Sequence, residues 1–400
     1  MKSLNVKAGR EENGGAQGKR MVNIELMRFV SMLLIVMAHY LGKGNLLPPL
    51  NDKELNWAVY LPWILEGFVI LSINMYMMIT GYFLVSSSFK VSRLIKTVLQ
   101  VWFYSVAVGI VAGIFGFFPG EGLSGYYVLE LMFPISMNQY WFMTAYVFMY
   151  LFTPFIAIGV RQLDKKQLQT VIILLLLAFC IVKSVTPGEL ETDMRGYDCI
   201  WYLCVCIIAA YIRLYGIPYI RSAKMGFLLC LAGATAIFAE TMALRWVYAA
   251  TGKLESILTI CYSFNHVFAL IASVGAFAGF AKLKLRPGIL SSCLLKISPY
   301  ILGVYLLHEH PAIRYRWPIW LGSKYAENGL WLIPWLVLAV CVVFAAGIVV
   351  DILRSILFGA LHRLLLYIPF YRKLADQVRK MDARMAQPGG NGGDHEKTER

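Results

Sequence analysis

Apolar runs of about 20 residues, separated by short polar segments, recur along most of the chain. An α-helix of this length crosses the hydrocarbon core of a lipid bilayer. The pattern therefore predicts an all-α, polytopic integral membrane protein with about ten transmembrane helices. The expected spans are residues 22–42, 59–85, 95–118, 139–160, 168–184, 198–215, 224–249, 255–281, 296–310 and 330–353.

Polar segments flank these apolar runs. Residues 1–21 and 386–400 are polar and rich in glycine, which predicts disordered cytoplasmic tails. Basic and apolar positions alternate near the end of the chain, which favours an amphipathic helix on the inner membrane surface over residues 356–385. Residues 22–355 are then expected to form one membrane domain that contains all the spans.

Composition agrees with a membrane protein. Hydrophobic residues make up 59% of the chain and charged residues 15%, whereas soluble domains carry about 25% charged residues. The eight cysteines lie mostly inside apolar runs and form no CxxC pair with partner histidines. We interpret them as small buried apolar residues and expect no metal site.

The basic charge is distributed unevenly along the chain. The net charge is +14, and 27 of the 37 Lys and Arg residues lie in one set of alternating loops and tails, with 9 in the other set. Loops rich in Lys and Arg stay in the cytoplasm, so this bias predicts an even number of spans with both termini in the cytoplasm. We interpret the charge as an orientation signal that also contacts membrane lipid, and expect no nucleic-acid partner.

The first span, NIELMRFVSMLLIVMAHY, carries Glu25, Arg28 and His39. A charged group at bilayer depth costs about 2.5–3.5 kcal/mol on insertion scales. Arg28 and His39 are eleven residues apart, which is close to three helical turns, so both side chains are expected on one face of the helix. Glu25 can pair with Arg28 across one turn. This polar stripe must face other helices or a watery cavity.

Two interpretations of the stripe stay open on these residues alone. In a structural one, Arg28 reaches the inner headgroups, Glu25 neutralises it, and His39 lies at the outer interface. In a functional one, the imidazole of His39 exchanges protons at neutral pH, because histidine has an unperturbed pKa of about 6.5. A guanidinium does not deprotonate, so Arg28 would orient a substrate or stabilise charge.

Five segments, in this order along the chain, resemble the type 3 membrane acyltransferase family. Arg28 and His39 match its R/K-x10-H motif, and MYMMITGYFL (75–84) is similar to its FFxxSGYL stretch, with Thr80 where serine is usual. The other three are FKVSRLIKTVLQVWFYS (89–105), YWFMTAYVFMYLFTPF (140–155) and ISPYILGVYLLHEHPAIR (297–314). The resemblance covers about residues 22–355.

The resemblance implies transfer of an acyl group, usually acetyl, to a hydroxyl of a cell-envelope sugar or polysaccharide. The implied donor is a cytoplasmic acyl-coenzyme A, a substrate and not a bound cofactor. A multi-pass protein of the bacterial plasma membrane is implied as well. In this scheme His39 is the general base, or forms an acyl-imidazole, and Arg28 orients the donor.

Candidate donor-binding residues lie at the inner end of the second span. Lys90 and Arg93, followed by Lys96, could hold the donor phosphates by charge-assisted hydrogen bonds. Thr80 and Gly81 precede them, and Gly81 would let the pantetheine arm approach the backbone. Alternatively, the basic residues only mark the cytoplasmic side of the membrane, and Gly81 only allows close packing of helices.

Candidate acceptor-side residues lie near the outer ends of the spans. We expect Glu66 to orient His39, Tyr305 and His308 to assist the acceptor, and Tyr140 with Trp141 to stack on a sugar ring. An interfacial aromatic belt is the alternative for the last two. Glu240, Arg245 and His266 are also ionisable at depth but have no motif support. Asn74 is expected to bond to another helix. His310 and Arg314 follow His308 in the outer loop and are weaker candidates.

A secondary transporter, or a polysaccharide exporter without acyl transfer, stays possible on the sequence. Ionisable residues at membrane depth and helices interrupted by Gly or Pro are typical of transporters. A repeat between the two halves, which many transporters have, is not evident here. Thioester consumption by the purified protein separates the enzyme from both alternatives.

Overall fold

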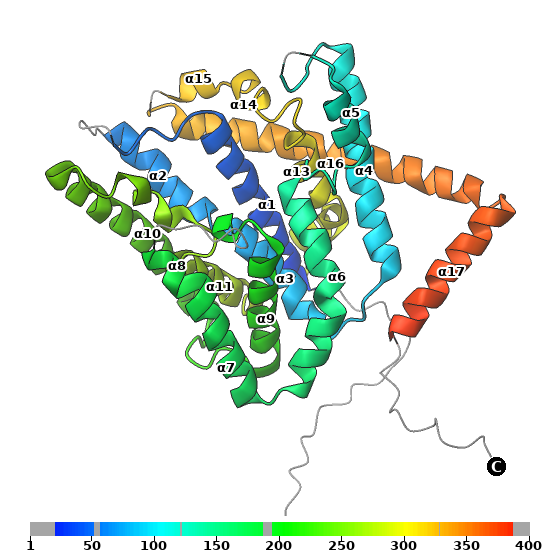
Figure 1. The fold of residues 1–400 in the computed structure, drawn as a ribbon, viewed down its shortest axis with the longest axis horizontal. Coiled ribbons are helices and arrows are strands. Elements are labelled where there is room, and N and C mark those ends of the chain that lie inside the picture. The colour runs from blue at the N-terminus through cyan, green and yellow to red at the C-terminus, as the bar shows by residue number, and fades with distance from the viewer. Residues whose placement is uncertain (1–20, 52–56, 121, 187–193, 328, 387–400) are drawn as a thin grey trace, which may run out of the picture.

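The computed structural model describes residues 21–51, 57–120, 122–186, 194–327 and 329–386. Within these residues all regular secondary structure is helical (Figure 1), so the predicted all-α fold is confirmed. The two predicted terminal tails lie outside the described residues, apart from Met21 and Ala386. Their predicted cytoplasmic location therefore stays a prediction.

Nine segments of the described chain are long and apolar enough to cross a membrane. The predicted span 198–215 corresponds to α9 (Cys199–Tyr215), which is apolar but shorter than the nine. Together they account for the ten runs in the sequence. The nine segments are Val22–Lys43, Tyr60–Leu84, Val91–Ile114, Trp141–Gln162, Lys165–Val185, Ala223–Thr251, Glu255–Ala281, Ile289–His308 and Leu332–Leu365.

Several of these segments consist of more than one helix. The first half of the chain holds α1 (Val22–Lys43), α2 (Trp57–Val69), α3 (Ser72–Leu84), α4 (Val91–Ile114), α5 (Gly125–Met132), α6 (Trp141–Gln162), α7 (Lys165–Leu176) and α8 (Val182–Val185). The second half, after α9, holds α10 (Ala223–Thr251), α11 (Val267–Ala281), α12 (Ile289–Ile297), α13 (Ile301–His308), α14 (Trp317–Trp320), α15 (Ser323–Ala326), α16 (Leu332–Leu365) and α17 (Pro369–Ala386).

The breaks in the spans have local causes. Pro299 lacks a backbone N–H and cannot continue the α12 helix, so a 3-10 turn at Ser298–Tyr300 separates α12 from α13. A break also separates α2 from α3, close to Asn74. The Asn74 amide donates to the Phe264 carbonyl at 2.8 Å and accepts from the Trp201 indole at 2.9 Å. This side chain thus ties three segments together at depth, as expected for an amide within a span.

Helix α1 lies in the middle of the bundle (Figure 1). It packs against α2, α3, α11, α12, α13 and α16. The side chains of Arg28 and His39 are 26% and 16% exposed. The polar stripe of α1 is therefore enclosed largely by protein, which is the requirement that the sequence imposed on it.

Helix α13 is held in place by a buried polar cluster. Asp351 of α16 is fully buried and accepts hydrogen bonds from Gln100 at 2.9 Å and Tyr104 at 3.1 Å. Arg354 pairs with both oxygens of the same carboxylate, at 2.7 and 3.0 Å. A Cβ at Gly303 of α13 would lie 2.4 Å from the Asp351 Cβ, so only glycine allows this approach. The cluster fixes the position of α13 along the bundle axis, and hence the position of His308.

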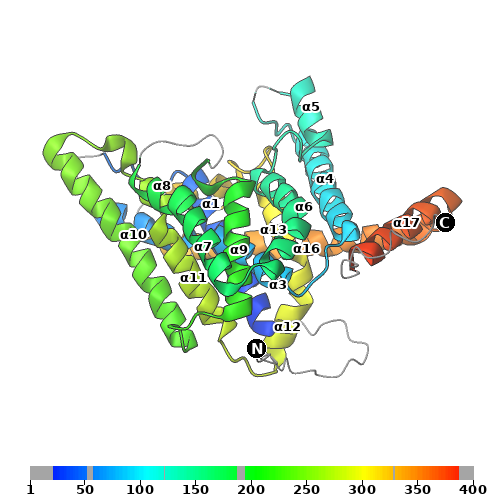
Figure 2. The same cartoon turned by 60° about the horizontal axis from the view of Figure 1, so that its bottom comes forward.

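The C-terminal helices differ from the predicted boundary. Helix α16 continues to Leu365, so the first ten residues of the predicted interfacial segment, 356–365, belong to the last spanning helix. Helix α17 has no buried residue and lies beside α4, away from the main bundle (Figures 1 and 2). The Ser92 backbone N–H donates to Asp382 at 3.1 Å, which joins α17 to the start of α4.

Candidate functional site

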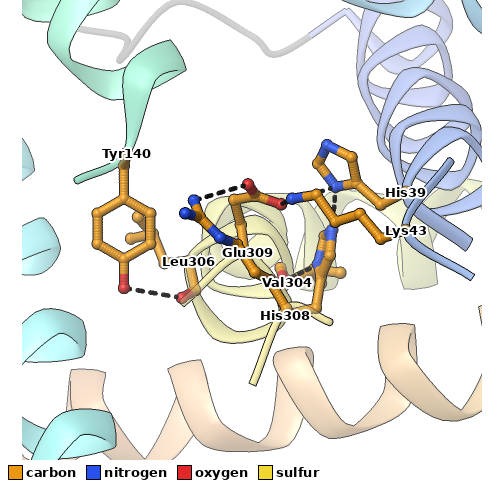
Figure 3. Close-up of polar contacts among 8 residues, drawn as sticks. His39, Lys43, Tyr140, Val304, Leu306, His308 and Glu309 are labelled. Carbon is orange, nitrogen blue, oxygen red and sulfur yellow. Dashed lines mark hydrogen bonds and ion pairs between the residues drawn. The ribbon is translucent and has the colours of Figure 1, made fainter. Parts of the chain in front are cut away.

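His39 and His308 meet at the end of the bundle that is predicted to face outside, here called the outer end. His39 comes from the last turns of α1 and His308 ends α13, so residues 269 positions apart become neighbours. The His39 Nδ1 atom lies 2.8 Å from the His308 Nε2 atom (Figure 3). The structure therefore brings together two of the histidines that the sequence singled out.

A backbone carbonyl determines which ring nitrogens of the two histidines carry protons. The His308 Nδ1 atom lies 2.5 Å from the Val304 carbonyl oxygen, which can only accept, so Nδ1 carries the proton. In neutral His308 the Nε2 atom is then an acceptor, and His39 must donate to it from Nδ1. The Nε2 atom of His39 is left with a bare lone pair.

Glu309 provides the carboxylate of the site. Its Oε2 atom lies 3.2 Å from His39 Nδ1 and forms a short ion pair with Lys43. Its Oε1 atom lies 3.7 Å from Arg314. The Glu309 side chain is only 2% exposed, so this charge is compensated inside the protein. Figure 3 shows that the Lys43 amine and the Glu309 carboxylate meet beside His39.

The sequence predicts no role for Glu309 or Lys43. It predicts instead that the carboxylate of Glu66 orients His39. That assignment is corrected: among the described residues, the carboxylate at the His39 ring belongs to Glu309. A signal existed, since Lys43 follows His39 by one helical turn and Glu309 follows His308 directly. Arg314, a weaker candidate of the outer loop, joins the same cluster.

Two groups of side chains in the described part of the chain have ligand atoms close enough for a metal ion. In the first, His39, His308 and Glu309, the Lys43 and Arg314 cations adjoin the carboxylate and would repel a divalent cation. This charge arrangement suits a hydrogen-bonded network better than a metal centre.

The second group is Glu240, Cys261 and His266, and it also fits a metal ion poorly. The His266 Nδ1 atom accepts from the Phe268 N–H at 3.4 Å, so neutral His266 carries its proton on Nε2. That Nε2 atom lies 3.5 Å from the Glu240 carboxylate. A protonated nitrogen cannot be a metal ligand, so His266, which is buried, forms a pair with the partly exposed Glu240.

His310 has a structural role in the outer loop. Its Nε2 atom donates to the Ser105 carbonyl at 3.1 Å, and its Nδ1 atom accepts from the Ala312 N–H at 3.2 Å. Burial lowers the pKa of His310 to about 4, which keeps the ring neutral. The two hydrogen bonds use both ring nitrogens, so His310 holds the loop to α4.

Arg28 lies at the opposite end of the α1 stripe. It forms a short ion pair with Glu25, which is 7% exposed, as the i, i+3 spacing predicted. Both charges interact electrostatically with Tyr76 of α3. Arg28 therefore lies near an aromatic residue of the neighbouring span.

Three aromatic residues of α6, each one turn apart, connect the two ends of the site. The Phe142 ring lies 5.3 Å from Tyr305 and 5.8 Å from Tyr76. Tyr146 stacks on Phe142 and Tyr150, with centroid distances of 6.4 and 6.1 Å. This file of rings extends from the neighbourhood of His39, 6.3 Å from Tyr305, towards the start of α4.

Most of the predicted donor-side residues adjoin this file at its inner end. Thr80 and Arg93 lie near Tyr146. The Tyr150 hydroxyl accepts from the Lys90 N–H at 3.2 Å. Gly81 lies elsewhere: a Cβ there would be 2.4 Å from the Cys206 carbonyl, so this glycine serves the packing of α3 on α9.

The predicted acceptor-side aromatics divide into two kinds. Tyr140 is fully buried and donates to the Leu306 carbonyl at 3.2 Å, so it is a core residue and not a platform for a sugar. Tyr305 is also buried, against His39 and Tyr140. Trp141 is half-buried and packs on Tyr197 at 4.5 Å.

Comparison with known proteins gives one match. A family model described as an acyltransferase domain matches residues 21–354. Neither a search of curated proteins nor a search of solved structures found a match. The matched range includes both histidines of the pair, the α6 file and Arg28, which together are the residues on which the site is built.

Proposed function

The chain belongs to the type 3 acyltransferase family, and we propose that it transfers an acyl group from cytoplasmic acyl-coenzyme A to a hydroxyl of a cell-envelope sugar or polysaccharide. Acetyl is the simplest donor group. Nine candidate spans make the chain a multi-pass membrane protein, and we place it in the bacterial plasma membrane. The observation that carries the proposal is the bare Nε2 atom of His39.

A sugar hydroxyl has a pKa far above 7 and attacks slowly unless a base removes its proton as it reacts. The His39 Nε2 atom is that base. The hydroxyl oxygen bonds to the thioester carbonyl carbon, the carbon–sulfur bond breaks, and the proton passes through His39 to the departing thiolate. No other reactant is required, so atoms and charge balance.

The neighbours of His39 support this step. While it holds the proton, His39 is an imidazolium, and the Glu309 carboxylate 3.2 Å from Nδ1 stabilises that charge. His308 keeps the ring in the tautomer that the reaction needs. Both are positioning residues, since they act through His39.

The inner residues provide a route for the donor. Lys90 and Arg93 bind its phosphates, and Thr80 and Arg28 guide the pantetheine arm along the file Tyr150, Tyr146 and Phe142. These three rings cover about 12 Å along α6. The file supports the proposal because a thin, flexible arm needs a continuous path from the basic segment to His39.

The test is acyl transfer from radiolabelled acetyl-coenzyme A by the purified protein in nanodiscs. His39→Ala is expected to lower turnover by about a hundredfold to ten-thousandfold, the usual contribution of a positioned base. Arg28→Ala is expected to abolish transfer by losing donor orientation. His362→Ala is the matched control, because His362 is exposed at the end of α16.

Transfer at the wild-type rate by either the His39 or the Arg28 variant would contradict the assignment. A transporter or exporter would consume no thioester at all in this assay. Correct insertion of each variant is checked by its elution as a single species and by its thermal unfolding.

A further inference from the structure

Three aromatic rings meet at the outer end of α6. The Tyr197 ring lies 4.5 Å from Trp141 and 4.7 Å from Phe264, and Trp141 stacks on Phe264 at 6.0 Å. Tyr197 is 40% exposed, whereas Phe264 is 7% exposed. The cluster is thus anchored in the core and open on the Tyr197 side.

This aromatic cluster, Trp141, Tyr197 and Phe264, belongs to the same end of the bundle as His39. Trp141 follows Tyr140, whose ring lies 6.2 Å from Tyr305, the neighbour of His39. Burial raises the pKa of Tyr197 to about 12, and the carboxylates of Glu66 and Glu309 contribute. Tyr197 therefore lies within electrostatic range of the carboxylate that contacts His39.

Two polar atoms near the cluster are buried without a hydrogen-bond partner among the described residues. They are the Oε2 atom of Glu66 and the hydroxyl of Tyr202. Tyr202 lies near Tyr197 and packs on Phe142, with the ring centroids 5.9 Å apart. A buried polar group without a partner costs about 1–3 kcal/mol. Such atoms beside a partly open aromatic surface point to a ligand that supplies hydroxyl groups.

We propose that the aromatic cluster is the platform of a saccharide subsite, in which Glu66 and Tyr202 bind hydroxyls of a pyranose ring stacked on the platform. The inference rests on the proposed function and names its acceptor class, a pyranoside. A pyranose has an apolar C–H face that packs on aromatic rings, and a rim of hydroxyls that donate to a carboxyl and accept from a phenol.

The test measures binding without any donor. Wild-type protein in phospholipid nanodiscs is titrated calorimetrically with methyl β-glucopyranoside and methyl β-galactopyranoside, because sugar-headed detergents would compete. We expect at least one of them to bind. Tyr197→Ala and Glu66→Gln should each weaken that binding by about tenfold, equivalent to about 1.4 kcal/mol.

Matched variants control for the substitutions themselves. Tyr126→Ala removes another exposed tyrosine from α5, and Glu327→Gln neutralises an exposed carboxylate that is not part of the cluster. Both should bind the pyranoside as wild type does. Tyr197→Phe should keep the affinity, because it keeps the ring; loss of binding in this variant would contradict a stacking role.

The experiment separates a failure of the saccharide subsite from a failure of the proposed acyl transfer. His39→Ala should still bind the pyranoside, because the platform does not use the base. Binding without any acyl transfer in the wild type would refute the proposed function alone. The subsite is refuted if the wild type binds neither pyranoside, or if Tyr197→Ala and Glu66→Gln bind as tightly as the wild type.

Discussion

At the scale of single residues, the chemistry of His39 depends on a backbone oxygen. The Val304 carbonyl fixes the proton on His308 Nδ1, and this in turn orients the proton of His39. Two imidazoles without that carbonyl would have two tautomeric arrangements of similar free energy, and only one leaves His39 Nε2 bare. A peptide group in α13 thus selects the tautomer of a side chain in α1.

The two histidines of the sequence HEH illustrate how different neighbours give one residue type different roles. His308 contacts His39, which meets the substrate in the proposed reaction, whereas His310 uses both ring nitrogens to hold the outer loop. The sequence alone could not separate them, because they are two positions apart and share an apolar environment.

His310 predicts a dependence of stability on pH. Its pKa is lowered to about 4 by burial, whereas an unfolded chain has a histidine pKa of about 6.5. Between these values the unfolded state binds a proton that the folded state does not, so stability falls as the pH falls. The loss reaches about 3 kcal/mol at pH 4.

The measurement is thermal unfolding of the nanodisc-embedded protein between pH 7 and pH 4.5. His310→Gln should start from a lower unfolding temperature but lose less on acidification. An identical pH dependence in wild type and variant would show that other groups cause the acid sensitivity.

At the scale of secondary-structure elements, the buried carboxylate of Asp351 joins three helices. It binds Gln100 and Tyr104 of α4 and Arg354 of α16, directly behind Gly303 of α13. Asp351→Ala would leave Arg354 without its carboxylate in a nearly dry position. Removing one partner of a buried ion pair costs about 3–5 kcal/mol.

We therefore expect Asp351→Ala to lower the unfolding temperature clearly and to reduce acyl transfer, because α13 carries His308. Asp376→Ala is the matched control: this aspartate pairs with Arg379 on the exposed face of α17. Equal unfolding temperatures for the two variants would contradict a structural role for the Asp351 cluster.

The lengths and order of the helices were predictable because hydrophobic length is set by the bilayer. The interruptions were not all predictable. Pro299 marks one break in the sequence, whereas the break between α2 and α3 falls at Ile70 and Leu71, where the sequence has neither Gly nor Pro. The end of α16 was misjudged because basic residues such as Arg363 continue the helix beyond its apolar part.

At the scale of the whole molecule, α1 forms the axis around which the other spans are arranged. Its stripe was recognisable from spacing, since Arg28 and His39 share a face regardless of their surroundings. The partners of the stripe were not, because Glu309 and His308 approach it only through the fold. The sequence therefore predicts one half of the site and the structure adds the other.

The charge bias of the loops predicts an even number of spans, with both termini in the cytoplasm. A reporter domain fused after residue 386, or before residue 21, should lie in the cytoplasm. Green fluorescent protein and alkaline phosphatase are suitable, because the first is fluorescent inside the cell and the second active outside. Phosphatase activity in either terminal fusion would require an odd number of spans or the reverse orientation.

The pairing of His39 with His308 also has a consequence for biosynthesis. The first histidine enters the membrane with the opening helix, and its partner follows only after three-quarters of the protein has left the ribosome. A nascent or prematurely terminated polypeptide can therefore not assemble the His39–His308 pair, so in the proposed reaction it cannot waste thioester by hydrolysis during translation.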